Sequence, residues 1–126
     1  MVKVFIVEDD ISLQFLYEQM LEFNGFEVVG IAGNGEEAVE MYKTFATKPD
    51  VVLMDHRMPL KNGIEATKEI LQIDVNSKII FTSADSSVKE EALSIGAIGF
   101  EEKPFTIEKL RIRIQQALNL QSMIKM

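Results

Sequence analysis

Short apolar runs alternate with stretches of helical periodicity along the chain. Several runs are continuous and rich in β-branched residues, which is typical of strands covered on both faces. Between them, apolar residues such as Leu13, Leu16 and Met20 recur at helical spacing. The runs predict strands at Val4–Val7, Val28–Ala32, Val51–Met54, Ile79–Phe81 and, more weakly, Ala97–Phe100. The periodic stretches predict helices at Ile11–Phe23, Glu36–Phe45, Ile64–Ile73, Val88–Ile95 and Ile107–Ile124.

Capping signals mark the ends of several predicted helices. An Asn or Ser followed three residues later by Glu predicts an N-terminal cap, because the first side chain accepts hydrogen bonds from free backbone N–H groups. This spacing occurs at Asn34 and Glu37, at Asn62 and Glu65, and at Ser87 and Glu90. Gly25 and Gly96 lie where left-handed backbone would end a helix.

The alternation predicts an α/β fold of five strand–helix units, (βα)5, with a five-stranded parallel sheet and helices on both faces. Right-handed crossovers and the small size favour a doubly wound sheet with strand order 2-1-3-4-5, numbered along the chain. Binding sites in such sheets lie at the carboxyl ends of the strands, where the order reverses. That point lies here between Val4–Val7 and Val51–Met54, so the residues that follow these two strands are the first candidates for a site.

The composition indicates one globular domain and excludes several function classes. The chain has 126 residues, 47% of them apolar, which suffices for a core without disulfides or structural metals. It has no cysteine, which excludes thiol chemistry, and one histidine, His56, which argues against a His-rich metal site. The net charge of −7 opposes direct binding to nucleic acid or anionic lipid.

No targeting or membrane segment is predicted. The N-terminal apolar run is too short for the core of a signal peptide before it meets acidic residues. No apolar run approaches the ~18 residues of a membrane span. We therefore expect a soluble protein of a reducing compartment such as the cytoplasm, without membrane insertion.

Acidic residues follow the first and third predicted strands. Glu8, Asp9 and Asp10 come after the first strand, and Asp55 comes after the third. Carboxylates that meet in one crevice repel and raise one another's pKa unless a cation neutralises them. Oxygen ligands without imidazole or thiolate favour Mg²⁺, which binds one or two carboxylates with water and phosphate. Asp10 is more simply explained as a helix N-cap.

A hydroxyl and an ammonium group are expected at the same edge of the sheet. Thr82 and Ser83 follow Ile79–Phe81, and Lys103 follows the last strand. Adjacent strand residues face opposite ways, so only one of the two hydroxyls can point at the crevice. With Asp55, the set would contain a carboxylate nucleophile and groups that hold phosphoryl oxygens.

Four motifs together resemble the response-regulator receiver domain of two-component signal transduction, over essentially the whole chain. They are Val7-Glu8-Asp9-Asp10, Leu53 to Pro59 followed by Asn62-Gly63, Thr82-Ser83-Ala84, and Lys103-Pro104-Phe105. No single motif is specific, but all four in this order on alternating strands are. The resemblance implies a flavodoxin-like fold of the chemotaxis-regulator type. It also implies a single receiver domain over residues 1–126, with no output domain in this chain, that is a regulatory phosphoacceptor rather than an enzyme.

The resemblance further implies the chemistry of the acidic residues. Asp55 would accept a phosphoryl group from a sensor histidine kinase or a phosphotransfer protein. Glu8, Asp9 and Asp55, with the backbone carbonyl of Arg57, would hold Mg²⁺, and Mn²⁺ would be able to substitute. Lys103 would contact the phosphoryl oxygens, and its bond to Pro104 would be a cis peptide.

By the same resemblance, Ser83 is the switch hydroxyl and Phe100 occupies the aromatic switch position, which is often Tyr in relatives. Phosphorylation would then change the face formed by Val88–Ile95, Ala97–Phe100 and Ile107–Ile124, where an effector or a second copy would bind. On the last helix, Ile112 falls opposite the apolar stripe and is flanked by two arginines. Two interpretations stay open: an ordinary exposed apolar residue or an anchor for the partner.

In the family, the positions two after the phosphorylated Asp and two after the switch hydroxyl flank the path of the water that removes the phosphoryl group. Here these positions are Arg57 and Asp85. In one interpretation Arg57 spans the site to Asp85 and shields the phosphorus. In the other, both side chains point into solvent.

Other phosphate-binding functions fit the sequence less well. Gly33 to Ala38 matches a dinucleotide pattern, but it follows the second strand and carries two glutamates that would face a pyrophosphate. An FMN site would need hydroxyls where three acids stand, and a dehalogenase-type phosphatase would need Asp at Arg57. His56 adjoins Asp55 on the strand and is expected to face away from it. A receiver-like binding module that never uses phosphate stays open, although the intact acidic set argues against it.

Overall fold

Five parallel strands form the centre of the structure, a computed structural model that describes residues 1–125 and the side chains up to Asn119. Their order, β2-β1-β3-β4-β5, is the one that the sequence predicts. The strands are β1 (Lys3–Val7), β2 (Glu27–Ala32), β3 (Val51–Met54), β4 (Ile79–Ser83) and β5 (Gly99–Glu102). The helices are α1 (Ile11–Phe23), α2 (Gly35–Thr44), α3 (Gly63–Ile73), α4 (Lys89–Ser94) and α5 (Ile107–Lys125), with a 3₁₀ turn, η1 (Ser86–Val88), before α4.

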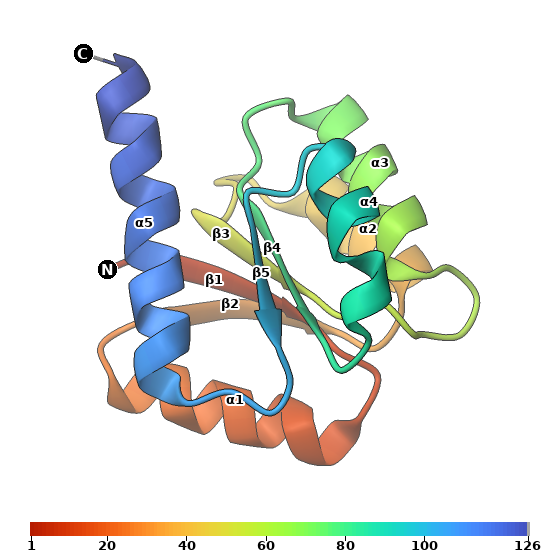
Figure 1. Cartoon of the computed structure of the whole chain (residues 1–126), viewed down its shortest axis with the longest axis horizontal. Coiled ribbons are helices and arrows are strands. Elements are labelled where there is room, and N and C mark those ends of the chain that lie inside the picture. The colour runs from red at the N-terminus through yellow and green to blue at the C-terminus, as the bar shows by residue number, and fades with distance from the viewer. Residues whose placement is uncertain (126) are drawn as a thin grey trace.

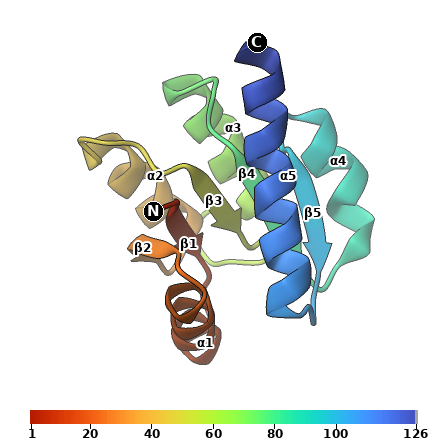
Figure 2. The same ribbon diagram turned by 90° about the vertical axis from the view of Figure 1, so that its left-hand side faces the viewer.

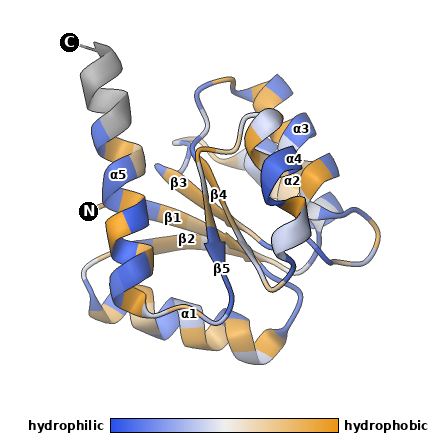
Figure 3. Cartoon of the chain, viewed as in Figure 1, coloured by the Kyte–Doolittle hydropathy of each residue, from blue (hydrophilic) through white to orange (hydrophobic). Residues whose placement is uncertain are grey.

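The helices cover both faces of the sheet, and each face buries a hydrophobic cluster. α1 and α5 lie on one face, and α2, α3 and α4 lie on the other (Figure 1 and Figure 2). Alternate strand residues point to opposite faces, so β1 contributes Ile6 to the α1–α5 side and Phe5 to the other side. In Figure 3 the inner strands are largely hydrophobic, whereas the end of β5 is hydrophilic.

β5 differs from the sequence prediction. The predicted strand is Ala97–Phe100, but the observed strand is Gly99–Glu102 because its pairing with β4 continues as far as Ser83. The buried carboxylate of Glu101 is tolerated there because Arg113 of α5 binds it, with Nε 3.0 Å from Oε2. The polar end of β5 therefore belongs to the strand and not to the following loop.

Capping explains where the helices begin. The predicted caps at Asn34 and Asn62 are confirmed, and Asn62 forms a complete capping box with Glu65. The predicted cap at Ser87 is wrong, because the side chain of Asp85 accepts the backbone N–H of Ser87 at 3.0 Å and starts a 3₁₀ turn instead. As a result α4 is shorter than predicted, without a side-chain cap of its own.

Gly25 and Gly96 end α1 and α4 with φ angles of 88° and 117°, the left-handed backbone that the sequence predicts at these positions. Among residues 1–125, no helix has both the length and the apolar character that a membrane span requires.

Candidate functional site

The acidic residues that follow β1 and β3 meet at one edge of the sheet. Val7 pairs with Met54 in these neighbouring parallel strands, so Glu8 and Asp55 leave the sheet side by side. Glu8, Asp9 and Asp55 each place one carboxylate oxygen within 4.8 Å of the others. Glu8 and Asp55 are buried, whereas Asp9 is exposed. Carboxylates at this separation repel one another unless positive charge lies nearby.

Three hydrogen bonds hold Glu8 in place, two to its carboxylate and one to its backbone carbonyl. Lys103 Nζ donates to Glu8 Oε1 at 2.6 Å, and the backbone N–H of Asp10 donates to Oε2 at 3.1 Å. The side-chain amide of Gln14 donates to the backbone carbonyl of Glu8 at 2.6 Å. A buried carboxylate needs such partners, because desolvation without them is costly.

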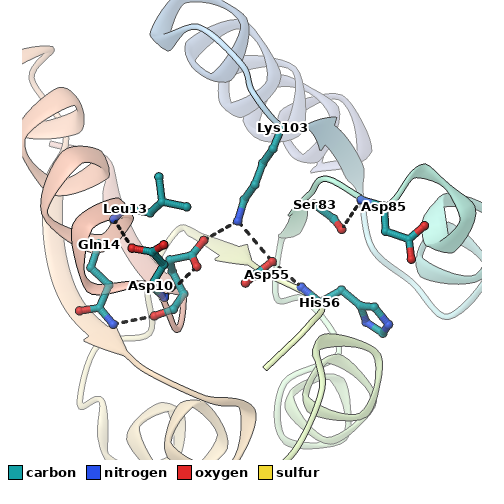
Figure 4. A network of polar contacts seen from close by, with 9 residues as sticks. Asp10, Leu13, Gln14, Asp55, His56, Ser83, Asp85 and Lys103 are labelled. Atoms are coloured by element: carbon teal, nitrogen blue, oxygen red, sulfur yellow. Dashed lines mark hydrogen bonds and ion pairs between the residues drawn. The ribbon is translucent and has the colours of Figure 1, made fainter. Parts of the chain in front are cut away.

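Asp55 lies at the centre of the polar network in Figure 4. Its Oδ1 accepts from the backbone N–H of His56 at 2.9 Å and from Lys103 Nζ at 3.4 Å. Burial raises the pKa of Asp55 from 3.8 to about 7, an effect that Lys103 opposes and Glu8 reinforces. The charge on this carboxylate at neutral pH therefore depends on how much positive charge surrounds it.

Lys103 reaches the acids from the segment that follows β5. Its backbone N–H donates to the carbonyl of Ser83 at 2.9 Å, which fixes this segment to the end of β4. Burial works against the charge of Lys103, but its hydrogen bond to Glu8 and the nearby carboxylate of Asp55 raise its pKa above the ordinary 10.5. The ammonium group thus stays charged and offsets the two buried acids. The predicted cis peptide between Lys103 and Pro104 is present.

Ser83, and not Thr82, faces the acids. A cavity of about 350 Å³ opens at this edge of the sheet, and its lining residues are Asp55, Arg57, Ser83, Ala84, Asp85 and Lys103. Ser83 Oγ accepts from the backbone N–H of Asp85 at 3.0 Å (Figure 4). Thr82 is buried outside this cavity, as the alternation of strand side chains requires.

Arg57 and Asp85 form an ion pair at the edge of the cavity. Arg57 Nη2 lies 2.9 Å from Asp85 Oδ2, although the side chain of Arg57 is 79% exposed. Hydrogen bonds lower the pKa of Asp85 to about 2, and the bond from Ser87 contributes more than the bond from Arg57. The structure thus shows the contact between Arg57 and Asp85 that one of the two interpretations requires, on a side chain of Arg57 that is largely open to solvent. Shielding of the phosphorus by this pair stays a prediction.

The donor set fits a hard divalent cation. It consists of carboxylate oxygens from Glu8, Asp9 and Asp55, without imidazole or thiolate. Mg²⁺ and Mn²⁺ prefer such oxygen ligands. Asp9 is exposed and so leaves the cluster open to solvent on one side.

Comparison with known proteins identifies the family. The profile described as "Response regulator receiver domain" matches residues 4–115. This chain belongs to that family. Receiver domains of two-component systems are regulatory phosphoacceptor domains, which agrees with an acidic pocket built around one buried Asp.

Several CheY proteins are similar to this receiver domain. Chemotaxis protein CheY of Thermotoga maritima is 44% identical over 119 residues, which cover 93% of this chain and 94% of that protein. CheY of Bacillus subtilis is 41% identical over 119 residues, 93% of this chain and 98% of that protein. A chain in the crystal structure of the CheX–CheY–BeF3–Mg²⁺ complex from Borrelia burgdorferi has a TM-score of 0.88 and 30% identity, covering 92% of this chain and 88% of that chain.

The side chains of three other residues singled out by the sequence do not belong to the acidic cluster of the receiver domain. Asp10 caps α1, where its Oδ1 accepts from Leu13 N at 3.1 Å. The ring of His56 turns away from Asp55, as expected (Figure 4), and its centroid lies 6.5 Å from that of Phe81. Phe100 is 7% exposed and packs in the hydrophobic cluster under α4.

The polar contacts of Gln14 with Glu8 and of Glu101 with Arg113 were not predicted. Gln14 supports Glu8, and the available signal was a polar residue in the first turns of the helix that follows the acids. Glu101 and Arg113 form a pair between β5 and α5, and no local pattern links these two positions. The acids and Lys103 could thus be predicted, whereas Gln14 and the Glu101–Arg113 pair could not.

The charge on Asp55 makes the stability of the metal-free protein depend on pH. Asp55→Asn raises the melting temperature by a few degrees at pH 8 and changes it much less at pH 5. The folded state holds the Asp55 proton more tightly than the unfolded chain, because the pKa is about 7 against the ordinary 3.8. The free energy of unfolding therefore falls as pH rises between these values, and the loss is complete above about pH 7. Asn has no proton to lose and escapes this effect.

Thermal melts followed by circular dichroism in EDTA measure the difference between the two proteins. A stabilisation of equal size at both pH values, or a larger one at pH 5, would contradict the assignment of the raised pKa to Asp55.

Proposed function

We propose that this receiver domain is a phosphorylation-operated switch in which Asp55 accepts a phosphoryl group from a histidine kinase or a phosphotransfer protein. The observation that carries the proposal is the buried carboxylate of Asp55, which lines an open cavity beside Glu8, Asp9 and Lys103. A carboxylate in this setting is a nucleophile with compensating charge already in place. The family to which the chain belongs supports the same role.

In the transfer, an ionised oxygen of Asp55 attacks the phosphorus of a phosphohistidine on the donor. The O–P bond forms, the P–N bond breaks, and the leaving imidazole takes up a proton from solvent. Such a transfer depends on positioning and charge stabilisation rather than on covalent help from the protein. Lys103, 3.4 Å from Asp55 Oδ1, is placed to bind one phosphoryl oxygen, and Ser83 lines the same cavity as a hydroxyl donor.

Glu8, Asp9 and Asp55, with the backbone carbonyl of Arg57, would hold Mg²⁺ in this switch, and Mn²⁺ would suit the same oxygen donors. When bound, the cation offsets the negative charge of the acids and of the phosphoryl group. The hard donor set supports this assignment, as does a relative whose crystal structure is described as a complex with BeF3 and Mg²⁺.

Ser83 and Phe100 would carry the signal to a partner face formed by α4, β5 and α5. A Ser83 hydroxyl that turns toward the phosphoryl group no longer accepts the backbone N–H of Asp85, which donates to Ser83 Oγ at 3.0 Å in this structure. Phe100 pairs with Phe81 on the neighbouring strand and packs under α4, so a shift of the segment after β4 changes the space around its ring. Local change at the phosphoryl group is thereby converted into a change of surface.

Thermal melts with Mg²⁺ and beryllofluoride distinguish this function from that of a binding module that never uses phosphate. A ligand that binds only the folded state stabilises it by about 2.7 kcal/mol at a hundredfold excess over its Kd, which is roughly 10 °C at this chain length. Mg²⁺ raises the melting temperature, and the phosphoryl mimic beryllofluoride raises it further only with Mg²⁺ present. A phosphate-independent module gives neither increase.

Two neighbouring acids provide matched variants for this experiment. Asp9→Asn removes a proposed ligand and loses most of the Mg²⁺-dependent increase. Asp10→Asn removes the same charge one residue later but keeps the N-cap to Leu13, so the increase remains. A melting temperature unmoved by millimolar Mg²⁺, or a full increase in Asp9→Asn, would show that the cluster does not bind magnesium.

The Arg57–Asp85 pair is expected to prolong the phosphorylated state. Hydrolysis needs a water lined up behind the phosphorus, and the Arg57 side chain crosses the edge of the cavity where that water would enter. A misplaced water costs on the order of a hundredfold in rate. Arg57→Ala therefore shortens the half-life of the phosphoryl group several-fold or more, and Asp85→Ala shortens it less.

The decay of labelled phosphoprotein after removal of the donor measures these half-lives. Arg57→Lys is the control, because lysine keeps the positive charge but has a shorter side chain without the guanidinium group. A half-life that is unchanged or longer in Arg57→Ala contradicts shielding and leaves the phosphoacceptor role intact.

The partner face carries an exposed apolar residue, Ile112, which is 50% exposed on α5. It borders a cavity of about 380 Å³ together with Glu101, Lys109, Arg113 and Gln116. An apolar side chain surrounded by charged groups is typical of an interface anchor with a polar rim. Ile112→Asp is expected to weaken phosphorylation-dependent association at least tenfold while phosphate uptake stays normal.

Light scattering with and without beryllofluoride follows self-association, and pull-down of an effector follows binding to another protein. Phe23→Asp is the matched control, since Phe23 is 92% exposed on α1, away from this face. Association that is equally strong in Ile112→Asp and in the control would show that Ile112 is an ordinary exposed apolar residue and not an anchor for the partner.

A further inference from the structure

The loop between β3 and α3, residues 56–62, is pressed against the first residue of α2. The backbone N–H of Gly35 donates to the carbonyl of Lys61 at 3.1 Å. A Cβ atom at Gly35 would overlap that carbonyl oxygen and would lie 2.9 Å from its carbon and 3.0 Å from Lys61 Cβ. Most of these atoms are backbone and cannot rotate away, so glycine is required here for space. The two segments are far apart in sequence, and their closeness depends on Gly35.

The rest of the loop is held just as firmly. Gly63 N–H donates to the carbonyl of His56 at 2.9 Å, and a side chain at Gly63 would overlap the carbonyl oxygen of Asp55. Lys61 forms an ion pair with Glu69 of α3. Leu60 has a φ of 68°, a left-handed conformation that a leucine rarely adopts. A displacement at Lys61 therefore has few ways to be absorbed inside the loop.

This loop carries groups that belong to the proposed phosphoryl site. The backbone carbonyl of Arg57 is a proposed metal ligand. The guanidinium group of the same residue forms an ion pair with Asp85 at the edge of the cavity. The backbone N–H of His56 donates to Asp55 Oδ1 at 2.9 Å. α2 has no residue that lines this cavity, yet its first residue contacts the loop directly at Lys61.

We propose that Gly35 is a positioning residue for the metal site: its close backbone contact with Lys61 fixes the 56–62 loop, so that a side chain at position 35 weakens Mg²⁺ binding. The inference rests on the proposed function, because it assumes that the loop carbonyl and the three acids bind the cation. Groups that orient metal ligands without touching the metal typically change metal affinity by 10–100-fold, and we expect a loss in that range.

Isothermal titration of Mg²⁺ into unphosphorylated Gly35→Ala tests the proposal. Gly33→Ala is the matched control, because Gly33 lies in the same turn and a Cβ there would meet nothing closer than Gln14 Nε2 at 3.8 Å. We expect Gly35→Ala to bind Mg²⁺ 10–100-fold more weakly and Gly33→Ala to bind it like the unmodified protein. Far-UV circular dichroism and cooperative melting establish that both variants are folded. Equal Mg²⁺ affinity in folded Gly35→Ala would overturn the proposal.

A second pair of variants changes the backbone preference of the same loop without altering α2. This pair tests whether the loop controls Mg²⁺ binding even if Gly35→Ala does not fold. Leu60 is 78% exposed, so a change there alters backbone preference more than packing. Leu60→Val disfavours the positive φ, whereas Leu60→Asn tolerates it. We expect weaker Mg²⁺ binding in Leu60→Val and unchanged binding in Leu60→Asn, and equal affinities in the two would contradict control by the loop.

The unmodified protein separates this proposal from the one on which it rests. If it binds no Mg²⁺, the proposed metal site is wrong. If it binds Mg²⁺ and folded Gly35→Ala binds equally well, only the positioning role of Gly35 is wrong.

Discussion

Glu8 and Asp55 are buried next to each other, and repulsion between their carboxylates must be offset for the sheet edge to form. The parallel pairing of β1 with β3 places Glu8 and Asp55 side by side, and the backbone N–H of Asp55 donates to the carbonyl of Val7 at 2.9 Å. Lys103 makes their burial tolerable with an ammonium group 2.6 Å from one and 3.4 Å from the other. The pKa of Asp55 nevertheless stays near 7. Lys103 thus offsets only part of the effect of burial and of Glu8 on Asp55. A divalent cation beside the acids would add further positive charge and favour the ionised carboxylate.

The surrounding elements hold this unfavourable arrangement in place. The backbone of Lys103 is bonded to the end of β4, and Gln14 of α1 supports the backbone of Glu8. The loop after Asp55 makes close backbone contacts with Gly63 of α3 and with Gly35 of α2. These contacts are far apart in sequence but converge on one edge of the sheet, so much of the fold serves to keep a few charged groups at fixed separations.

The strand order and the acidic set could be predicted from the sequence, because local signals mark the strands and general rules of chain connection order them. Apolar runs mark the strands, and the acids stand directly after two of them, so topology alone brings Glu8 and Asp55 together. The start of α4 could not be predicted, because Asp85 competes with Ser87 for the role of cap. The Gly35–Lys61 contact and the Glu101–Arg113 pair could not be predicted either. Each joins segments whose packing depends on the assembled fold rather than on any periodicity.

Mapping the phosphoryl group after transfer decides whether Asp55 is the acceptor. The protein is incubated with a phosphorylated histidine donor and Mg²⁺, and the modified residue is located by mass spectrometry of proteolytic fragments, with Asp55→Asn treated in parallel. We expect one acid-labile phosphoryl group, on Asp55, and none in the variant. A phosphoryl group on another residue, or labelling of Asp55→Asn to the same extent, would contradict the role of Asp55 as the phosphoryl acceptor.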